Sequence, residues 1–136
     1  MVAALARATG VPAVRLPTSR SRGPVGLGVR LLSAQLRSRL RRAGLRTTED
    51  YAGLDGAGAM DQARFTETLT RLARDGAASA EVNTHPGEPG EAALARFGWG
   101  YRWADELAML TAPATRALVD RLGYRLGTFA DLAGAR

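Results

Sequence analysis

His85 is the single histidine of the chain, and it lies where an apolar-alternating run gives way to Pro86 and Gly87. A strand that ends in this way presents a polar side chain on an exposed loop. Imidazole can donate or accept a proton near neutral pH, so proton transfer is the chemistry this position could perform. A lone histidine in a loop is also a common surface residue, and both interpretations stay open at this point.

Four carboxylates accompany His85, namely Glu81 and Glu88 on either side of it and Asp105 and Glu106 on a nearby predicted helix. Such a set can exchange protons but cannot by itself hold a metal ion tightly. The chain has no cysteine, no lysine and no second histidine, which excludes thiolate chemistry, a lysine-containing phosphate loop and a histidine metal pair. Any transition-metal site would need further ligands from elsewhere.

Short strands alternating with helices are predicted to position these groups. Helices are expected over 2–9, 27–43, 61–75, 101–110, 113–122 and 129–132, and strands over 11–16, 45–48, 78–83 and 124–128. Loops are expected over 18–28, 50–59 and 86–98. This alternation indicates parallel pairing through crossover connections and therefore an α/β fold. The order begins with a helix, so the chain is expected to enter in the middle of such a fold.

Helix ends and buried faces can also be predicted. Asp61 is expected to cap one helix and Gly76 to end it, and Pro113 is expected to begin another. Side chains at buried spacing are Phe65, Leu69, Leu72, Trp103, Leu107, Leu110, Leu118, Val119 and Leu122. Trp103 is accordingly assigned to the core, whereas Trp99, which lies between two glycines, is the better candidate for stacking on a ligand.

Charge is unevenly distributed along the chain. Residues 1–46 hold ten arginines and no acidic residue, whereas residues 47–136 hold nine arginines and thirteen acidic residues. Such asymmetry can indicate binding to nucleic acid or an anionic membrane. No aromatic residue precedes Tyr51, so the basic half has no ring on which bases could stack. A positive surface that meets an acidic partner segment is therefore favoured over nucleic-acid binding.

Length and hydropathy bound the class of protein. A chain of 136 residues is expected to form one domain. No run approaches the ~18 apolar residues of a membrane span. The apolar stretch 1–14 is interrupted by Arg7, Gly10 and Pro12 and makes a poor signal peptide, so the expected compartment is the cytoplasm.

Several segments carry a family resemblance when they are taken in order. They are 5–17, 43–53, 81–87 with its His-Pro-Gly, 103–107 with Trp-Ala-Asp-Glu-Leu, and 126–132 with Leu-Gly-Thr-Phe-Ala-Asp-Leu. Together they resemble the C-terminal part of the YdjC-like (ChbG/HpnK) carbohydrate deacetylases, with the hopanoid-associated branch nearest in texture. Each segment is weak alone, but their order and spacing are specific, and the match covers nearly the whole chain.

The resemblance implies a metal-dependent hydrolase that removes an N-acetyl group from an amino sugar or glycolipid on a distorted (β/α) barrel. In such enzymes a divalent cation, Mg²⁺ or Zn²⁺, polarises the acetyl carbonyl, an aspartate activates water and an acid protonates the leaving amine. The family's Asp-Asp motif and two metal-binding histidines have no counterpart here. Residues 1–136 are therefore expected to be a single incomplete domain, the C-terminal half of the barrel. We expect such a truncated chain to be inactive alone and unable to hold the metal alone.

Carried over residue by residue, the resemblance assigns His85 as the catalytic acid or a substrate contact. Arg15, Glu81, Trp99 and Glu106 become substrate-binding or supporting residues. The missing N-terminal half or a second copy of the chain is the expected protein partner. Two alternatives remain: a non-catalytic remnant that acts as an interaction module through an exposed sheet edge, and a basic nucleic-acid binder that uses residues 1–46.

Overall fold

The computed structural model describes residues 2–134, and this part of the chain divides into two compact units. Unit 1 contains residues 2–52, 78–81 and 126–134, and unit 2 contains residues 53–77 and 82–125. Helices are mixed with short parallel strands, so the predicted α/β class is confirmed. One domain spanning the whole chain remains a prediction.

Unit 1 begins with helix α1, Val2–Ala8, followed by an extended segment. The strand predicted over 11–16 is reduced to a single parallel bridge between Ala13 and Arg46. Pro12 lies within this segment and Pro17 follows it, and neither has a backbone N–H, which limits a continuous ladder. The strand predicted over 45–48 is reduced to the same bridge, so both predictions were wrong in extent.

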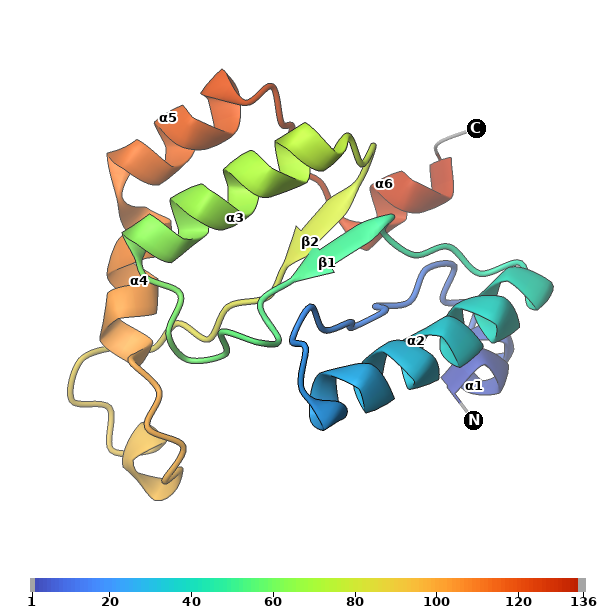
Figure 1. Cartoon of the computed structure of the whole chain (residues 1–136), viewed down its shortest axis with the longest axis horizontal. Helices are drawn as coiled ribbons and strands as arrows, with labels where there is room; N and C mark the ends of the chain where they lie inside the picture. The colour runs from blue at the N-terminus through green and yellow to red at the C-terminus, as the bar shows by residue number, and fades with distance from the viewer. Residues whose placement is uncertain (1, 135–136) are drawn as a thin grey trace. The chain divides into compact units, whose positions relative to one another are not determined.

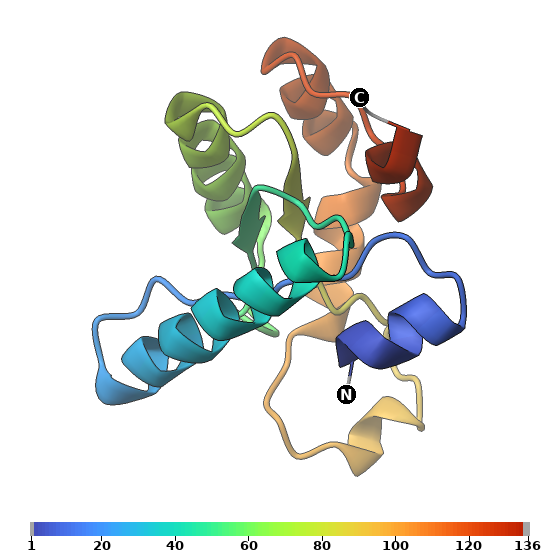
Figure 2. The same ribbon diagram turned by 90° about the vertical axis from the view of Figure 1, so that its right-hand side faces the viewer.

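Helix α2 of unit 1 spans Pro24–Arg42 and starts three residues earlier than predicted. Pro24 occupies the first turn, where its missing N–H costs nothing. Gly26 lies inside the helix, at a position that requires glycine because a Cβ there would collide with the backbone of Ser21. The predicted loop over 18–28 therefore ends at Gly23. Figure 2 shows the chain turning back after α2 towards the first strand.

The two strands are β1, Asp50–Ala52, and β2, Ala80–Val82, and they pair in parallel (Figure 1). Helix α3 connects them along the chain. Within unit 1 the backbone N–H of Asp50 donates to the carbonyl of Ser79 at 3.1 Å. The strand predicted over 78–83 is confirmed in a shorter form. The loop predicted over 50–59 was wrong at its start, because Asp50–Ala52 pairs with β2 despite the glycines that follow.

Unit 2 is built on three helices that pack on one another: α3, Gln62–Asp75; α4, Trp103–Thr111; and α5, Pro113–Arg121 (Figure 1). Asp61 caps α3 and Gly76 ends it with a φ of 75°, as predicted. The buried core cluster comprises Met60, Phe65, Leu69, Met109, Leu118 and Val119. A short 3-10 helix, η1, Leu94–Arg96, lies on the projecting loop before α4.

Two predicted features are corrected by the structure. Leu110 is exposed, and the buried face of α4 is formed by Glu106 and Met109. The strand predicted over 124–128 is absent from the described chain. Tyr124 N–H still bonds to the carbonyl of Val119, and Thr128 N–H donates to the carboxylate of Asp131 at the start of helix α6, Phe129–Gly134. These local bonds take the donors that a strand would need.

Within residues 2–134 no helix combines the length and the apolar character that crossing a bilayer requires.

Candidate functional site

His85 and Glu106 lie together in unit 2. His85 follows β2 on a loop, and Glu106 comes from the first turn of α4. The backbone N–H of His85 donates to Glu106 Oε2 at 2.5 Å, and Nδ1 of the imidazole lies 3.9 Å from the same oxygen. Nε2 of the ring lies 3.3 Å from the side-chain nitrogen of Asn83. A protonated imidazole would therefore have a carboxylate beside it to balance its charge.

Glu106 is fully buried, with an exposed fraction of 0%. Its other oxygen, Oε1, accepts the backbone N–H of Met60 at 3.0 Å. One carboxylate therefore joins the segment before α3 to the segment that carries His85. Buried carboxylates are stable only when hydrogen bonds or charges satisfy them, and these two N–H groups supply that satisfaction. Although it comes from a short helix with exposed neighbours, Glu106 is thus not a residue of the helix surface.

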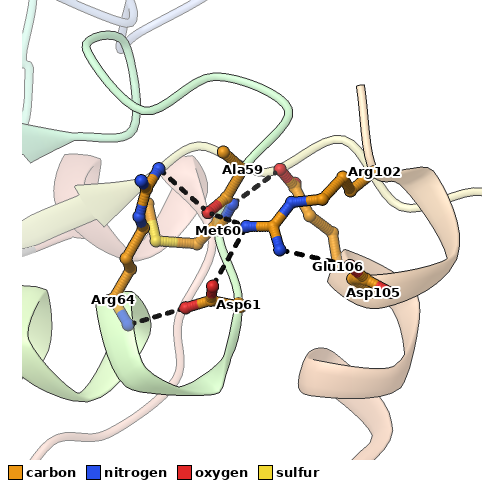
Figure 3. Close-up of polar contacts among 7 residues, drawn as sticks. All are labelled: Ala59, Met60, Asp61, Arg64, Arg102, Asp105 and Glu106. Carbon is orange, nitrogen blue, oxygen red and sulfur yellow. Dashed lines mark hydrogen bonds and ion pairs between the residues drawn. The ribbon is translucent and has the colours of Figure 1, made fainter. Parts of the chain in front are cut away.

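Arg102 forms a second set of contacts next to Glu106 (Figure 3). Its guanidinium donates to the carbonyl of Ala59 at 3.1 Å and to Asp61 Oδ2 at 3.0 Å, and it lies 3.4 Å from Asp105. Asp61 also accepts the backbone N–H of Arg64 at 3.0 Å as the cap of α3. This N–H and then the Arg102 guanidinium lower the pKa of Asp61 below its ordinary value of 3.8.

Four aromatic rings alternate along residues 97–103 and pack on one another beside His85. Trp99 lies 4.6 Å from Phe97, 5.3 Å from Tyr101 and 6.0 Å from Trp103, measured between ring centroids. The imidazole of His85 meets Tyr101 edge-on at 4.9 Å. Offset and edge-to-face pairs at these separations are attractive.

An open cleft of about 520 Å³ lies against these rings. Its lining includes Phe97, Tyr101 and Trp103 together with the carboxylates of Glu88 and Asp105, and Glu91 also lines it. Trp103 therefore lines the cleft and is absent from the buried core cluster, which corrects its predicted core role. Trp99 is 58% exposed and packs on the lining rings without itself lining the cleft.

Two glycines permit the close approach that builds this region. Gly58 has a φ of +75°, and a Cβ there would overlap the ring of Tyr101. Gly87 follows His85 closely, and a Cβ there would collide with Leu94 and approach Trp103. Its backbone N–H donates to the carbonyl of Trp103 at 3.2 Å. Because glycine has no side chain, the backbone at these two positions can pack closely against the aromatic residues.

Arg15 and Glu81, the other predicted site residues, are brought together within unit 1. Arg15 Nε donates to Glu81 Oε1 at 2.5 Å, and the side chain of Glu81 is 13% exposed. Oε2 of Glu81 is buried and has no hydrogen-bond partner among the described residues. Glu81 is therefore a paired, largely covered carboxylate that does not simply face solvent.

A divalent cation, which the resemblance implies, does not fit the residues described here. Residues 2–134 contain no grouping of three or more side chains that could hold a metal ion. The carboxylate nearest His85 belongs to Glu106, and both of its oxygens already accept backbone N–H groups.

Sequence reasoning missed three participants of this site: Tyr101, Arg102 and Asn83. A signal for Tyr101 was present, because every second residue from Phe97 to Trp103 is aromatic. In an extended segment such alternation predicts rings on one side. Arg102 and Asn83 gave no such signal, since their roles depend on contacts that only the fold creates.

The class that the fold and site define is thus an α/β protein with a cleft lined by aromatic rings, one of which contacts a histidine that is held by a buried carboxylate. The family model described as YdjC-like protein matches residues 1–121, and the chain belongs to this family.

Two similar proteins give this family assignment its context. A chitooligosaccharide deacetylase of Yersinia enterocolitica is 34% identical over 87 residues, which cover 63% of this chain and 34% of that protein. A crystal structure named as a cellobiose-phosphate cleavage protein of Enterococcus faecalis V583 has a TM-score of 0.68 at 19% identity. It covers 97% of this chain and 46% of that chain, and at this identity it shows the fold alone. The chain thus spans about a third of the length of the curated relative.

Proposed function

We propose that this chain supplies the saccharide-binding and proton-donating part of a carbohydrate deacetylase site. The observation that carries the proposal is a cleft lined by aromatic rings, one of which, Tyr101, contacts the imidazole of His85, in a chain that belongs to the YdjC-like family. Flat aromatic faces suit the apolar faces of sugar rings, while the imidazole lies at the edge of the same rings. The substrate class is an N-acetylated amino sugar.

In the proposed reaction, water adds to the carbonyl carbon of the acetamide and the C–N bond breaks. The amine nitrogen takes up a proton, so acetate and a free amino sugar are formed. We assign donation of that proton to His85, whose side chain is 25% exposed and can recover a proton from solvent. Glu106 is a positioning residue, because it fixes the backbone of His85 and faces its ring.

The proposal has finer parts that come from the family resemblance. The fold is proposed to be a distorted (β/α) barrel, and the divalent metal is proposed to be held by residues other than 2–134 of this chain. The chain is proposed to belong to the hopanoid-associated branch, with a glycolipid amino sugar as substrate. Arg15 and Glu81 are proposed as a supporting pair on this basis. We expect the chain alone to release no acetate from an N-acetylated chitooligosaccharide in the presence of Mg²⁺ or Zn²⁺. Acetate release by the native chain would overturn the expected inactivity. If that release were lost in His85→Ala, the result would support the role of His85.

Saccharide binding is tested by calorimetry of the full chain with N-acetylchitotriose. Phe97→Ala removes an exposed ring of the cleft lining, and Trp99→Ala removes the ring on which Phe97 and Tyr101 pack. Each variant should weaken binding by about 1 kcal/mol, or roughly fivefold. Phe129→Ala is the matched control, since it removes a half-exposed ring in unit 1. Absence of binding, or equal weakening in all three variants, would refute the proposal.

A second candidate function, an interaction module, is favoured by the outer side of α2. Val25, Leu31 and Leu32 are 81%, 65% and 68% exposed. Exposed apolar residues gathered on one helix are a common feature of association surfaces. Concentration-dependent self-association in light scattering, reduced by Leu31→Ser with Leu32→Ser, would support this candidate. A monomer at all concentrations would count against self-association through α2.

A further inference from the structure

The cleft in unit 2 has a charge opposite to that of the whole chain. Its lining contains Glu88, Glu91 and Asp105 against the single cation of Arg102, although the chain carries a net charge of +6. Arg102 is already engaged by Asp61 and Asp105. The carboxylates of Glu88 and Glu91 have no ion-pair partner within residues 2–134. The cleft therefore presents unpaired negative charge beside its rings.

Aromatic faces and unpaired carboxylates together recognise one kind of ligand group. An ammonium group is attracted by the negative face of an aromatic ring and by a carboxylate. A neutral acetamide gains little electrostatic attraction from either group. Phe97, Tyr101 and Trp103 provide the rings on the same lining. The rings and the carboxylates are independent features of the lining. Both attract a cation, and the rings also favour a ligand with a flat apolar face.

We propose that the cleft prefers amino sugars that carry free ammonium groups, so that partly deacetylated oligosaccharides bind more tightly than fully acetylated ones. This inference rests on the proposed function, because the sugar ring is what would stack on the aromatic faces. An ammonium group produced by removing one acetyl group would then remain held next to Glu88 and Glu91. The net positive charge of the chain makes unspecific attraction of such a cation unfavourable, so a preference must come from the local site.

Binding can be followed through the fluorescence of Trp99 and Trp103, the two tryptophans of the chain, both of which belong to the aromatic cluster. The full chain is titrated with the trimer of glucosamine, the trimer of N-acetylglucosamine and the linear polyamine spermine. We expect the glucosamine trimer to bind on the order of fivefold more tightly than the acetylated trimer at low salt. High salt should remove this advantage, because it screens exposed charges.

The double variant Glu88→Gln with Glu91→Gln should lose the preference and keep its affinity for the acetylated trimer. Glu67→Gln with Asp120→Asn is the control that removes the same number of charges, since Glu67 on α3 and Asp120 on α5 are exposed carboxylates outside the cleft lining. Equal binding of the two trimers, or a preference that survives in the double variant, would overturn this inference alone. Spermine that binds as tightly as the glucosamine trimer would overturn the role of the sugar ring. Failure of every saccharide to bind would overturn the proposed function as well.

Discussion

Glu106 accepts hydrogen bonds from the backbone N–H groups of Met60 and His85 and has no contact with solvent. Its neighbour Asp105 lies on the outside of the same helix, where its side chain is 54% exposed. The two carboxylates are adjacent in sequence and differ completely in environment. They form a matched pair for separating a buried structural contact from a surface charge.

Glu106→Gln should lower the free energy of unfolding by about 1–3 kcal/mol, because an amide offers one oxygen where the carboxylate offers two, and one backbone N–H loses its acceptor. Asp105→Asn should change it by less than about 1 kcal/mol, as surface ion pairs contribute little. Urea unfolding followed by tryptophan fluorescence measures both.

The positioning role of Glu106 needs a second readout. The side-chain NMR signal of His85 should move in Glu106→Gln and stay in place in Asp105→Asn. Equal stability of the two variants, or an unmoved His85 signal, would show that Glu106 does not position the histidine.

The N-terminal end of α3 depends on a cap that is also an ion-pair partner. Asp61 accepts the N–H of Arg64 and faces Arg102, and its pKa is lowered in the folded chain. A carboxyl whose pKa is lower when folded stabilises the fold above its unfolded pKa. That contribution disappears as pH falls through the folded value.

Asp61→Asn should therefore keep much of the cap, since asparagine also caps helices, while it removes this pH dependence. We expect the native chain to be more stable than the variant at pH 6. The difference should shrink as the pH falls below 3.8, the ordinary pKa of the group. Chemical unfolding at a series of pH values tests this. A difference that stays constant with pH would contradict the assignment.

The loop before α3 must pass beneath the ring of Tyr101, and Gly58 allows it to do so. Gly58→Ala combines a positive φ with a collision, so it should cost about 1–3 kcal/mol of stability and displace the ring. Gly56→Ala is the control in the same loop, because a Cβ there meets open space. Thermal unfolding of both variants measures the effect. Equal stabilities of the two variants would contradict this prediction, because they would show that the loop can accept a Cβ at position 58 without loss of free energy of unfolding.

At the scale of the whole molecule, the periodic helices were predictable, whereas of the short strands only β2 was predicted. Phe65, Leu69 and Leu72 marked α3 because their spacing matches a helical period, and local residues such as Asp61 and Gly76 fixed its ends. The segments 11–16 and 124–128 look like strands in hydropathy alone. Pro12 in the first and local bonds in the second decide otherwise, and pairing partners are not encoded in local sequence.

The candidate site was predictable to a similar degree. His85 and Glu106 were recognised from residue type and resemblance, and the structure brings them together. The burial of Glu106 depends on how α4 packs, which no local pattern specifies. The same packing brings the rings of 97–103 next to His85, although they lie more than ten residues away.

The central claim is that the aromatic rings line a saccharide site at which His85, in contact with the ring of Tyr101, donates a proton. Because the chain has one histidine and two tryptophans, all three side chains give unambiguous NMR signals in the ¹⁵N-labelled full chain. On titration with N-acetylchitotriose, the imidazole of His85 and the indoles of Trp99 and Trp103 should shift together along one saturation curve. Indole shifts without any change at His85, or no change in any of the three signals, would contradict the claim.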